Sequence, residues 1–462
     1  MIARQPANWL LHATPARGLA QHLPPPTPTI PLVCFTSALL LSLQALPTNA
    51  ETAYSVKTAG APPQELIIAL TLPSNEGQVR KLAVRGTAWG LESQVHSLRC
   101  GKTPLRQDAA GSWVAPGSCH MVTWHVSAKR VRDGAVDVSK QASLLFENPR
   151  WFLLSEPTSL LRLVGDSRQS TLTVSAGSLQ SIDLGATPAG KGRWRVPSTN
   201  NAPEFYVIGN IKPRTRSIGP FQVRYVADNP GRVDRLGLEA IHERALQYLV
   251  RVLPPPAALP IDERMLLVVW IGTDDRHGRA GGSAGSRSFV ANYVFGRAET
   301  EALNAARTLT ILAHEQFHQL SDLLRGSLQP FPVWLGESLA QYYGLKALAQ
   351  ASSGPAATSV RANFIDPTRP VNFGLVELNR RHAAKDPSAY RLFYEQGATF
   401  WAALDTAVLA RSGGTRSLDS LIPELLRSNP TEDGKLPAEF IDKLRLEIGS
   451  QTDELLSKYV GD

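Results

Sequence analysis

Two histidines and two glutamates in the stretch Thr308–Gly344 have the types and spacing of a catalytic zinc site. His314 and His318 are four residues apart, so on a helix both imidazoles project from the same face, one turn apart. Glu315 follows the first histidine, and eighteen residues separate His318 from Glu337. Two histidines and one glutamate supply three protein ligands and leave a fourth position open, which is typical of catalytic rather than structural zinc.

The residues before this motif favour a metal site over a chance match. The mostly apolar segment 309–313 predicts that the helix is buried. A pair of hydrogen-bonded core histidines is the alternative, but a buried polar cluster without partners is costly, and a metal ion is the simplest partner. We therefore predict one Zn²⁺ bound by His314, His318 and Glu337, with Glu315 as the general base.

Two segments outside the histidine motif extend the pattern. Residues 334–340 read WLGESLA around Glu337, and residues 394–398 read YEQGA. With the histidine motif they resemble gluzincin metallopeptidases of the aminopeptidase N type, to which the glycyl aminopeptidases are related; that family has WLNEGFA and YEKGA here. The resemblance covers about residues 266–405 and implies a thermolysin-like zinc domain that hydrolyses peptide bonds. It also implies that Tyr394 stabilises the tetrahedral intermediate, with Tyr390 as its nearest competitor.

The glycine-rich segment 278–285 departs from that family. Its members carry Gly-Ala-Met-Glu-Asn or Gly-Leu-Glu-His here, and the glutamate binds the free amine of the substrate. This chain has no carboxylate in the corresponding residues, Gly282, Ser283, Ala284 and Gly285. We still expect these residues to bind substrate, but unless Asp274 or Asp275 replaces the glutamate, cleavage should not depend on a free N-terminus. An endopeptidase, or a peptidase of altered specificity, is therefore the alternative to an aminopeptidase.

Neighbouring residues are predicted to support the site. Ser288–Phe295 is interpreted as the edge strand beside the active site, to which a substrate would add as a further strand; an ordinary surface hairpin is the alternative. Asp322 lies one turn after His318, and Gln341 one turn after Glu337, so either can orient a histidine. Both could equally be solvated helix residues.

The predicted fold class is α+β. Residues 51–215 alternate short apolar stretches with Gly, Pro, Ser and Asn, which predicts an all-β domain of the sandwich or saddle type. Residues 216–462 predict the thermolysin-like catalytic domain. In it we expect a helix over Val233–Val252, a buried strand over Leu266–Ile271 and, after Ala340, mainly helices.

The first fifty residues are predicted to be a signal peptide. They contain Arg4 and Arg17, no acidic residue, and an apolar run from Leu32 to Leu46 that is too short for a comfortable membrane span. Thr48-Asn49-Ala50 offers a small residue for cleavage before Glu51. The chain is therefore expected to be exported, periplasmic or secreted. An uncleaved anchor is the alternative, and it is the only source of membrane proximity that we expect.

Export has a consequence for the cysteines. Cys100 and Cys119 lie in a segment rich in Gly, Pro and Ser, and in an oxidising compartment this pair predicts a disulfide. Two unrelated thiols are the alternative. Because the segment is far in sequence from the zinc motif, the disulfide is expected to serve stability.

Charge and motif content narrow the class of partner. The chain has 48 basic and 40 acidic residues, and no run of Lys and Arg interleaved with aromatics, so nucleic acid is not an expected partner. We expect a peptide or protein substrate. A non-catalytic, zinc-stabilised envelope binding module remains the alternative outside the enzymes, although such a module would not need Glu315 or Tyr394.

Overall fold

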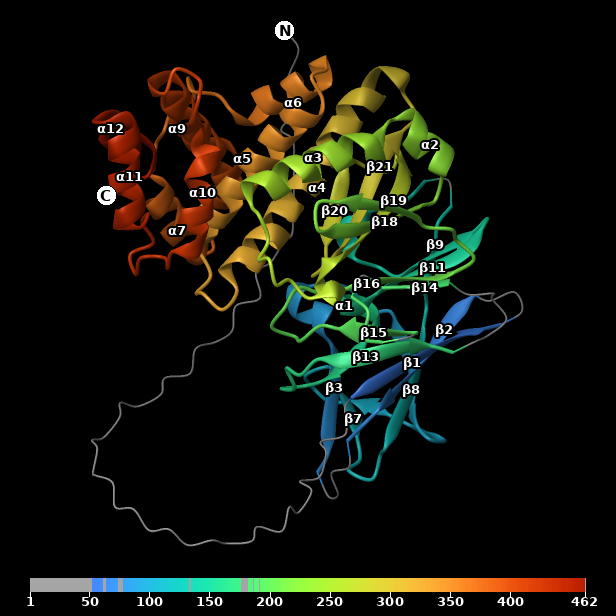
Figure 1. Ribbon diagram of the computed structural model, residues 1–462. Coiled ribbons are helices and arrows are strands. Elements are labelled where there is room, and N and C mark those ends of the chain that lie inside the picture. Colours follow the sequence, from blue (N-terminus) through green and yellow to red (C-terminus); the bar gives the residue numbers. More distant parts are fainter. Residues whose placement is uncertain are drawn as a thin grey trace, which may run out of the picture.

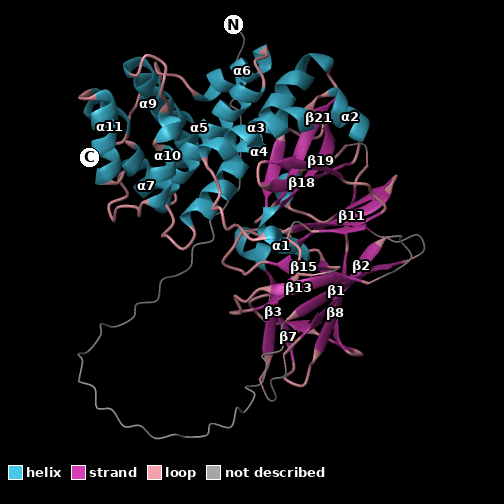
Figure 2. Cartoon of the chain, in the orientation of Figure 1, coloured by secondary structure: helices cyan, strands magenta, loops and turns pink. Residues whose placement is uncertain are grey.

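The computed structural model describes residues 52–60, 64–73, 78–132, 134–175, 182–185, 187–190 and 192–461. The predicted signal segment, residues 1–50, and its cleavage position lie outside these residues. Within the described part, the N-terminal half is rich in strands and the C-terminal half is rich in helices, as Figures 1 and 2 show. The fold class is α+β, as predicted.

The N-terminal half contains three sheets. The seven-stranded sheet has the order β15 (Arg193–Val196), β13 (Ser170–Val174), β1 (Ala53–Ala59), β2 (Glu65–Thr71), β8 (Met121–Val126), β4 (Val95–Cys100) and β5 (Thr103–Pro104). The four-stranded sheet has the order β12 (Leu161–Leu163), β3 (Arg80–Val84), β7 (Trp113–Ala115) and β6 (Arg106–Gln107). The five-stranded sheet has the order β14 (Ile182–Leu184), β16 (Phe205–Gly209), β11 (Arg150–Ser155), β10 (Leu144–Glu147) and β9 (Lys129–Arg130).

Alternation of apolar and polar residues explains the strands of this half. Leu66, Ile68 and Leu70 of β2 are fully buried, while their neighbours along the strand are partly exposed, as a sheet with one covered face requires. These side chains join one core with Tyr54 and Trp124. The short helix α1 (Glu156–Ser159) follows β11 directly and is buried throughout.

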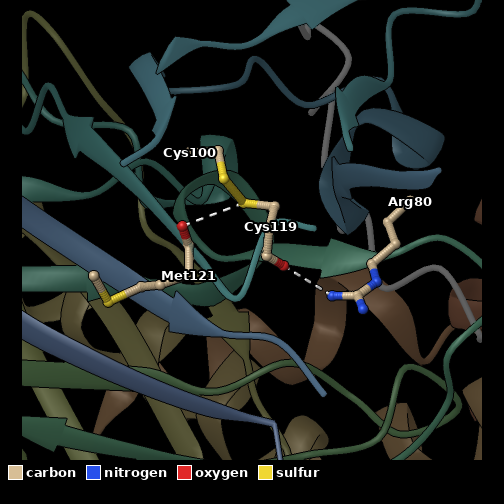
Figure 3. Close-up of a disulfide and its surroundings, with 4 residues drawn as sticks. All are labelled: Arg80, Cys100, Cys119 and Met121. Carbon is tan, nitrogen blue, oxygen red and sulfur yellow. Dashed lines mark hydrogen bonds between the residues drawn. A yellow bond between two sulfur atoms is a disulfide. The ribbon is translucent and has the colours of Figure 1, made fainter. Parts of the chain in front are cut away.

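The predicted disulfide between Cys100 and Cys119 is present. It joins the end of β4 to the segment that leads into β8, and the two Cα atoms are 5.8 Å apart. Figure 3 shows that the guanidinium of Arg80 donates a hydrogen bond of 3.1 Å to the carbonyl oxygen of Cys119. The bridge therefore belongs to the N-terminal half, away from the histidine motif, and its contacts are structural.

A fourth sheet belongs to the C-terminal half. Its order is β17 (Arg214–Ile218), β18 (Phe221–Ala227), β19 (Met265–Asp274), β21 (Ser288–Phe295) and β20 (Gly281–Ala284). β18, β19 and β21 run parallel, and β20 pairs antiparallel with β21. The expectation that Ser288–Phe295 forms the edge was therefore wrong: the glycine-rich segment itself extends as β20 and takes the edge position.

Both faces of this sheet are covered, which explains the apolar run in β19. Val268 and Trp270 face the helices, whereas Leu267 and Val269 face the five-stranded sheet of the N-terminal half. The fourth sheet thus lies between the helices and the N-terminal sheets (Figure 1). The two halves of the chain share a continuous apolar contact there.

The helices of the C-terminal half follow in order along the chain: α2 (Pro230–Arg235), α3 (Leu238–Val252), α4 (Ala298–Arg325), α5 (Val333–Ala351), α6 (Pro355–Phe364), α7 (Leu375–Ala383), α8 (Pro387–Leu392), α9 (Ala398–Arg411), α10 (Ile422–Arg427), α11 (Ala438–Ile448) and α12 (Gln451–Tyr459). The single helix expected over Val233–Val252 is two helices, because Gly237 has a left-handed φ of 63°. α4 packs against α5, and α3 contacts both. No helix among the described residues is long and apolar enough to cross a membrane.

Candidate metal centre and its cavity

Helices α4 and α5 bring the three predicted zinc ligands together. His314 and His318 project from one face of α4, and their Nε2 atoms are 3.2 Å apart. Oε2 of Glu337, on α5, lies 3.4 Å from Nε2 of His314 and 3.8 Å from Nε2 of His318. One ligand atom from each residue falls within 4.8 Å of the others, and this is the only such group among the described residues.

A glycine allows the two helices to approach closely enough for this cluster. A Cβ atom on Gly344 of α5 would lie 2.9 Å from the carbonyl oxygen of Thr310 and 3.0 Å from the backbone nitrogen of His314. Both contacts are too short for a side chain, so only glycine fits at this crossing. Because Glu337 lies two turns earlier on α5, the packing at Gly344 also sets how near its carboxylate comes to the histidines.

Gln341 orients His314. Its Oε1 lies 3.2 Å from Nδ1 of His314, and both side chains are buried. An amide oxygen can only accept a hydrogen bond, so the imidazole carries its proton on Nδ1 and turns the Nε2 lone pair toward the cluster. Gln341 is therefore in a position from which it can orient His314.

Asp322 is placed differently. It is an exposed residue on the cavity wall beside His318, and no hydrogen bond joins the two side chains in the described part of the chain. Desolvation by the surrounding cavity wall raises the pKa of Asp322, and the nearby His318 lowers it. Asp322 is therefore close to His318 but makes no hydrogen bond that would orient its ring.

Glu315 is buried and lines the same cavity, but it is not part of the three-residue ligand group. Burial raises its pKa, while His314 and His318 lower it and Glu337 raises it further. A carboxyl with a raised pKa next to a ligand cluster is suited to accept and return a proton. The position separates Glu315 from the ligands, as its predicted role requires.

Tyr394 reaches the cluster from a different element. It lies in a turn of π-helix, Phe393–Gly397, between α8 and α9. Its hydroxyl donates a hydrogen bond of 2.8 Å to Oε2 of Glu337, and its ring stacks on that of His314 with centroids 5.5 Å apart. The hydroxyl of Tyr390, on α8, lies 3.0 Å from that of Tyr394. Single π-helical turns inside helices often occur at functional sites.

The cluster strongly perturbs its own ionisation. Burial alone would raise the pKa of Glu337, but the imidazoles of His314 and His318, whose Nε2 atoms lie 3.4 and 3.8 Å from its Oε2, hold it well below the usual range. Burial would lower the pKa of His318, yet the hydrogen bond and the charge of Glu337 raise it to about 9. The anionic carboxylate and the imidazoles therefore stabilise one another, which is typical of functional sites.

A cavity of about 1500 Å³ lies beside the cluster, between the two halves of the chain. Glu315, His318 and Glu337 line one wall. The predicted substrate-binding residues, Gly282, Ser283, Ala284 and Gly285, line it as well. The hydroxyl of Ser283 donates to the carbonyl of Val138 in the N-terminal half, at 2.6 Å, and therefore fastens the edge strand rather than facing a ligand.

Neither aspartate proposed to replace the missing glutamate lines this cavity. Asp274 lies where β19 pairs with Phe295, at the opposite end of the sheet from Gly285. Its carboxylate is bound by Arg276 at 2.8 Å, and that of Asp275 by Arg297 at 2.6 Å. Both carboxylates are thus already paired and remote from the cluster.

Glu204 lines the cavity but was not predicted from the sequence. It directly precedes β16 of the five-stranded sheet and is only 1% exposed. Its sequence context, Pro203-Glu204-Phe205, carries no motif. Only the packing of the N-terminal half against β20 and β21 brings this carboxyl to the cavity, so no sequence signal could have found it.

The geometry can be compared with known proteins. Neither a protein-family model nor a curated protein sequence matches this chain. Among solved structures, the chain aligns with an aminopeptidase N family protein from Idiomarina loihiensis with a TM-score of 0.60 and 14% identity, over 89% of this chain and 76% of that one. It also aligns with Legionella pneumophila aminopeptidase A in complex with aspartic acid, with a TM-score of 0.42 and 14% identity, over 89% of this chain and 49% of that one. The first alignment shows that this chain has an aminopeptidase-like fold.

Proposed function

We propose that this protein is a zinc-dependent peptidase of the gluzincin type, related to the aminopeptidase N enzymes. The observation that carries the proposal is the convergence of His314, His318 and Glu337 to within 4.8 Å beside a large cavity. Glu315 and Tyr394 are next to this cluster, as hydrolysis would require. A binding module that used a metal only for stability would have no need of these two side chains.

The three side chains fit a zinc ion. Two imidazole nitrogens and one carboxylate oxygen form a donor set that Zn²⁺ prefers, and three protein ligands leave a position for substrate or water. The hydrogen bond from Nδ1 of His314 to Gln341 leaves Nε2 free to act as a ligand. When bound, the metal supplies Lewis-acid activation of a water molecule and of the scissile carbonyl.

Glu315 is the proposed general base. It accepts a proton from the water that attacks the scissile carbonyl and returns this proton to the leaving amine. Burial raises the pKa of Glu315, which brings the free energies of its protonated and ionised forms closer together at neutral pH. Glu315 can therefore both accept the proton from water and release it to the leaving amine. The phenol of Tyr394 is the proposed donor to the oxyanion that forms on the carbonyl oxygen.

The edge strand β20 is the proposed support for the substrate backbone. One edge of β20 pairs with β21, and β20 is the last strand of the sheet. An extended peptide can therefore add as a further strand along its other edge. Gln319, next to His318, donates a hydrogen bond of 2.9 Å to the carbonyl of Gly285 and so connects the metal helix to the end of this strand. A peptide on the edge would pass the cluster.

Export from the cytoplasm is also proposed. The disulfide between Cys100 and Cys119 supports an oxidising compartment. Cell fractionation, together with the N-terminal sequence of the mature protein, tests whether residues 1–50 are removed. Recovery of the full chain in the cytoplasm would contradict export.

Metal analysis combined with a peptide library tests the function. The purified protein should contain about one equivalent of zinc and should cleave peptides, whereas His318→Ala should lose both. His277→Ala is a matched control, because this histidine is well exposed and outside the cavity. Full zinc content in His318→Ala, or a zinc-loaded protein that cleaves no library peptide with either a free or a blocked N-terminus, would contradict the proposal.

A further inference from the structure

The π-helical turn Phe393–Gly397 presents Tyr394 to the candidate metal centre, and contacts from outside the turn hold it there. π-Helices are rare and occur mostly as single turns within α-helices. This turn lies between α8 and α9, so the position of the Tyr394 hydroxyl depends on how the turn is anchored. Residues 395, 396 and 397 each make an anchoring contact.

Glu395 and Gly397 fix the turn to the structure around it. The carboxylate of Glu395 is bound by Arg369 at 2.6 Å and by Arg391, on α8, at 2.7 Å. A Cβ atom on Gly397 would overlap Cβ of Ser338 on α5, so a side chain does not fit at this position. The turn therefore packs directly against the helix that carries the third candidate ligand.

Gln396 ties the turn to the C-terminal end of the described chain. Its Nε2 donates hydrogen bonds to the carbonyl oxygens of Phe373, at 2.9 Å, and of Tyr459, at 3.1 Å. A primary amide nitrogen carries two protons, so each carbonyl can accept one of them. Phe373 lies in the segment before α7, and Tyr459 is the last residue of α12. One side chain thus joins the turn to two segments that are 23 and 63 residues away in the sequence.

The segments that supply these two carbonyls are themselves held together. The backbone nitrogen of Val376 donates to the carbonyl oxygen of Val460 at 3.2 Å. A Cβ atom on Gly374 would overlap the same carbonyl group, so only glycine allows this close approach. The ring of Tyr459 lies near that of Phe400 on α9, with centroids 6.1 Å apart. The end of α12 and the start of α7 therefore form one support for the amide of Gln396.

The two hydrogen bonds of Gln396 oppose displacement of the turn. The side chain is only 6% exposed, so movement of the turn away from α12 would leave a buried amide without acceptors. A buried polar group that loses its partners destabilises the chain. Tyr394 lies two residues before Gln396 in the same turn, so such a movement would also draw its hydroxyl away from Glu337.

We propose that Gln396 is a positioning residue that holds the hydroxyl of Tyr394 at the candidate metal centre by tying the π-helical turn to the end of α12. This inference rests on the proposed peptidase function, in which Tyr394 donates to the oxyanion. The amide of Gln396 is engaged by two backbone carbonyls, so it acts on the reaction only through the turn. The last helix of the described chain thereby supports the chemistry at a distance.

Gln396→Met tests this role, because methionine has a similar length and no hydrogen-bond donor. We expect kcat to fall by about 10- to 100-fold, since a small misplacement of a catalytic group can cost about 100-fold. KM and the zinc content should stay the same, because Tyr394 acts on the transition state and not on the bound substrate. If Gln396→Met does not fold, Gln396→Asn keeps the amide but shortens its reach and should give the same result.

A double-mutant cycle with Tyr394→Phe separates positioning from a general loosening of the fold. Without the phenol, Gln396→Met should cause no further loss of kcat. Leu444→Ala is the matched control, because Leu444 on α11 is fully buried in the same core. It should lower the midpoint of thermal unfolding at least as much as Gln396→Met and leave kcat unchanged.

Three results would overturn the inference and leave the peptidase function standing. The first is a loss of kcat from Gln396→Met that is equally large in the Tyr394→Phe background. The second is a rise in KM at unchanged kcat, and the third is an equal loss of kcat in Leu444→Ala.

Hydrogen–deuterium exchange gives a readout that does not need turnover. The backbone amides of residues 393–397 should exchange faster in Gln396→Met than in wild type, whereas those of α11 should exchange equally in both. Faster exchange of the turn, together with a wild type that hydrolyses no peptide, would keep the anchoring by Gln396 and overturn the proposed function. Unchanged exchange of the turn, together with hydrolysis by wild type, would overturn the anchoring and keep the function.

Discussion

The hydroxyl of Tyr394 donates a hydrogen bond of 2.8 Å to the Glu337 oxygen that also faces both histidines. Tyr394, which lies 57 positions after Glu337 in the sequence, therefore directs its hydroxyl proton toward the candidate metal centre. If this proton serves the oxyanion, Tyr394→Phe should lower kcat by about 100- to 1000-fold, which is the effect of removing one oxyanion donor. Steady-state kinetics at full zinc occupancy measure this effect.

Tyr390→Phe is the matched control for that variant. Its hydroxyl is 3.0 Å from that of Tyr394, whereas the hydroxyl of Tyr394 donates to Oε2 of Glu337 at 2.8 Å. We expect a smaller loss of kcat than for Tyr394→Phe. The reverse order of the two losses would assign the oxyanion role to Tyr390.

Gln341 should tune the affinity for metal. Gln341→Leu keeps the approximate volume of the side chain and removes the acceptor on Nδ1 of His314. Loss of such a partner typically weakens metal binding by about 10- to 100-fold, so competition with a chelator should show that shift. Asp322→Asn changes a charge without removing a hydrogen bond and should have a smaller effect. Equal affinities in wild type and Gln341→Leu would show that the hydrogen bond does not orient the ligand.

Helix packing at the metal centre should depend on Gly344. Gly344→Ala introduces a Cβ atom into contacts of 2.9 and 3.0 Å with α4, and overpacking of this kind costs about 1 to 3 kcal/mol. Gly336→Ala, on the same helix, has no neighbouring atom nearer than 4.0 Å and should stabilise the chain by about 0.4 to 1 kcal/mol. Urea unfolding measures both. Similar effects of the two substitutions would contradict the close approach of α4 and α5.

The stability of the chain should fall in mild acid because of His242. Burial lowers the pKa of this residue to about 4, and it is held by the hydroxyl of Tyr225 at 2.6 Å and by Gln316 at 2.9 Å. Between pH 6.5 and 4, His242 therefore binds a proton in the unfolded chain but not in the folded one. The free energy of unfolding that the chain has above pH 6.5 consequently decreases as the pH falls. The loss reaches about 3 kcal/mol near pH 4.

Urea unfolding of the metal-free protein between pH 4 and 7 tests this dependence without interference from zinc release. His242→Gln should reduce the slope of the free energy of unfolding against pH, and the reduction should correspond to at most one bound proton. His120→Gln, a change at an exposed histidine, should leave it unchanged. An unaltered slope in His242→Gln would show that other groups cause the acid sensitivity.

The shared face of His314 and His318 could be predicted from the sequence because it depends on local spacing. Four residues on a helix place His314 and His318 on one face whatever surrounds them. The apolar run in β19 likewise identified a strand covered on both faces. Both patterns depend only on residues within one helix or one strand, so they can be recognised in the amino-acid sequence alone.

Features that depend on packing between distant segments could not be predicted in the same way. The predicted edge strand was Ser288–Phe295, but the edge strand in the structure is Gly281–Ala284. The glycines of this segment give no strand signal in the sequence, and only their pairing with β21 makes the segment a strand. Glu204 lies more than a hundred residues before His314, and only the contact between the two halves of the chain brings it to the cavity. The absence of a carboxylate in residues 278–285 therefore did not mean that the cavity lacks one.

The most direct test of a zinc peptidase is Glu315→Gln, which keeps the shape of the side chain and removes its ability to accept a proton. Glu315 is buried beside the ligands but is not part of the ligand group, so the variant should keep about one equivalent of zinc. Peptide hydrolysis should fall by about 100- to 10,000-fold, the usual contribution of a general base. Unchanged hydrolysis at full zinc occupancy would contradict the role of Glu315 and the mechanism built on it.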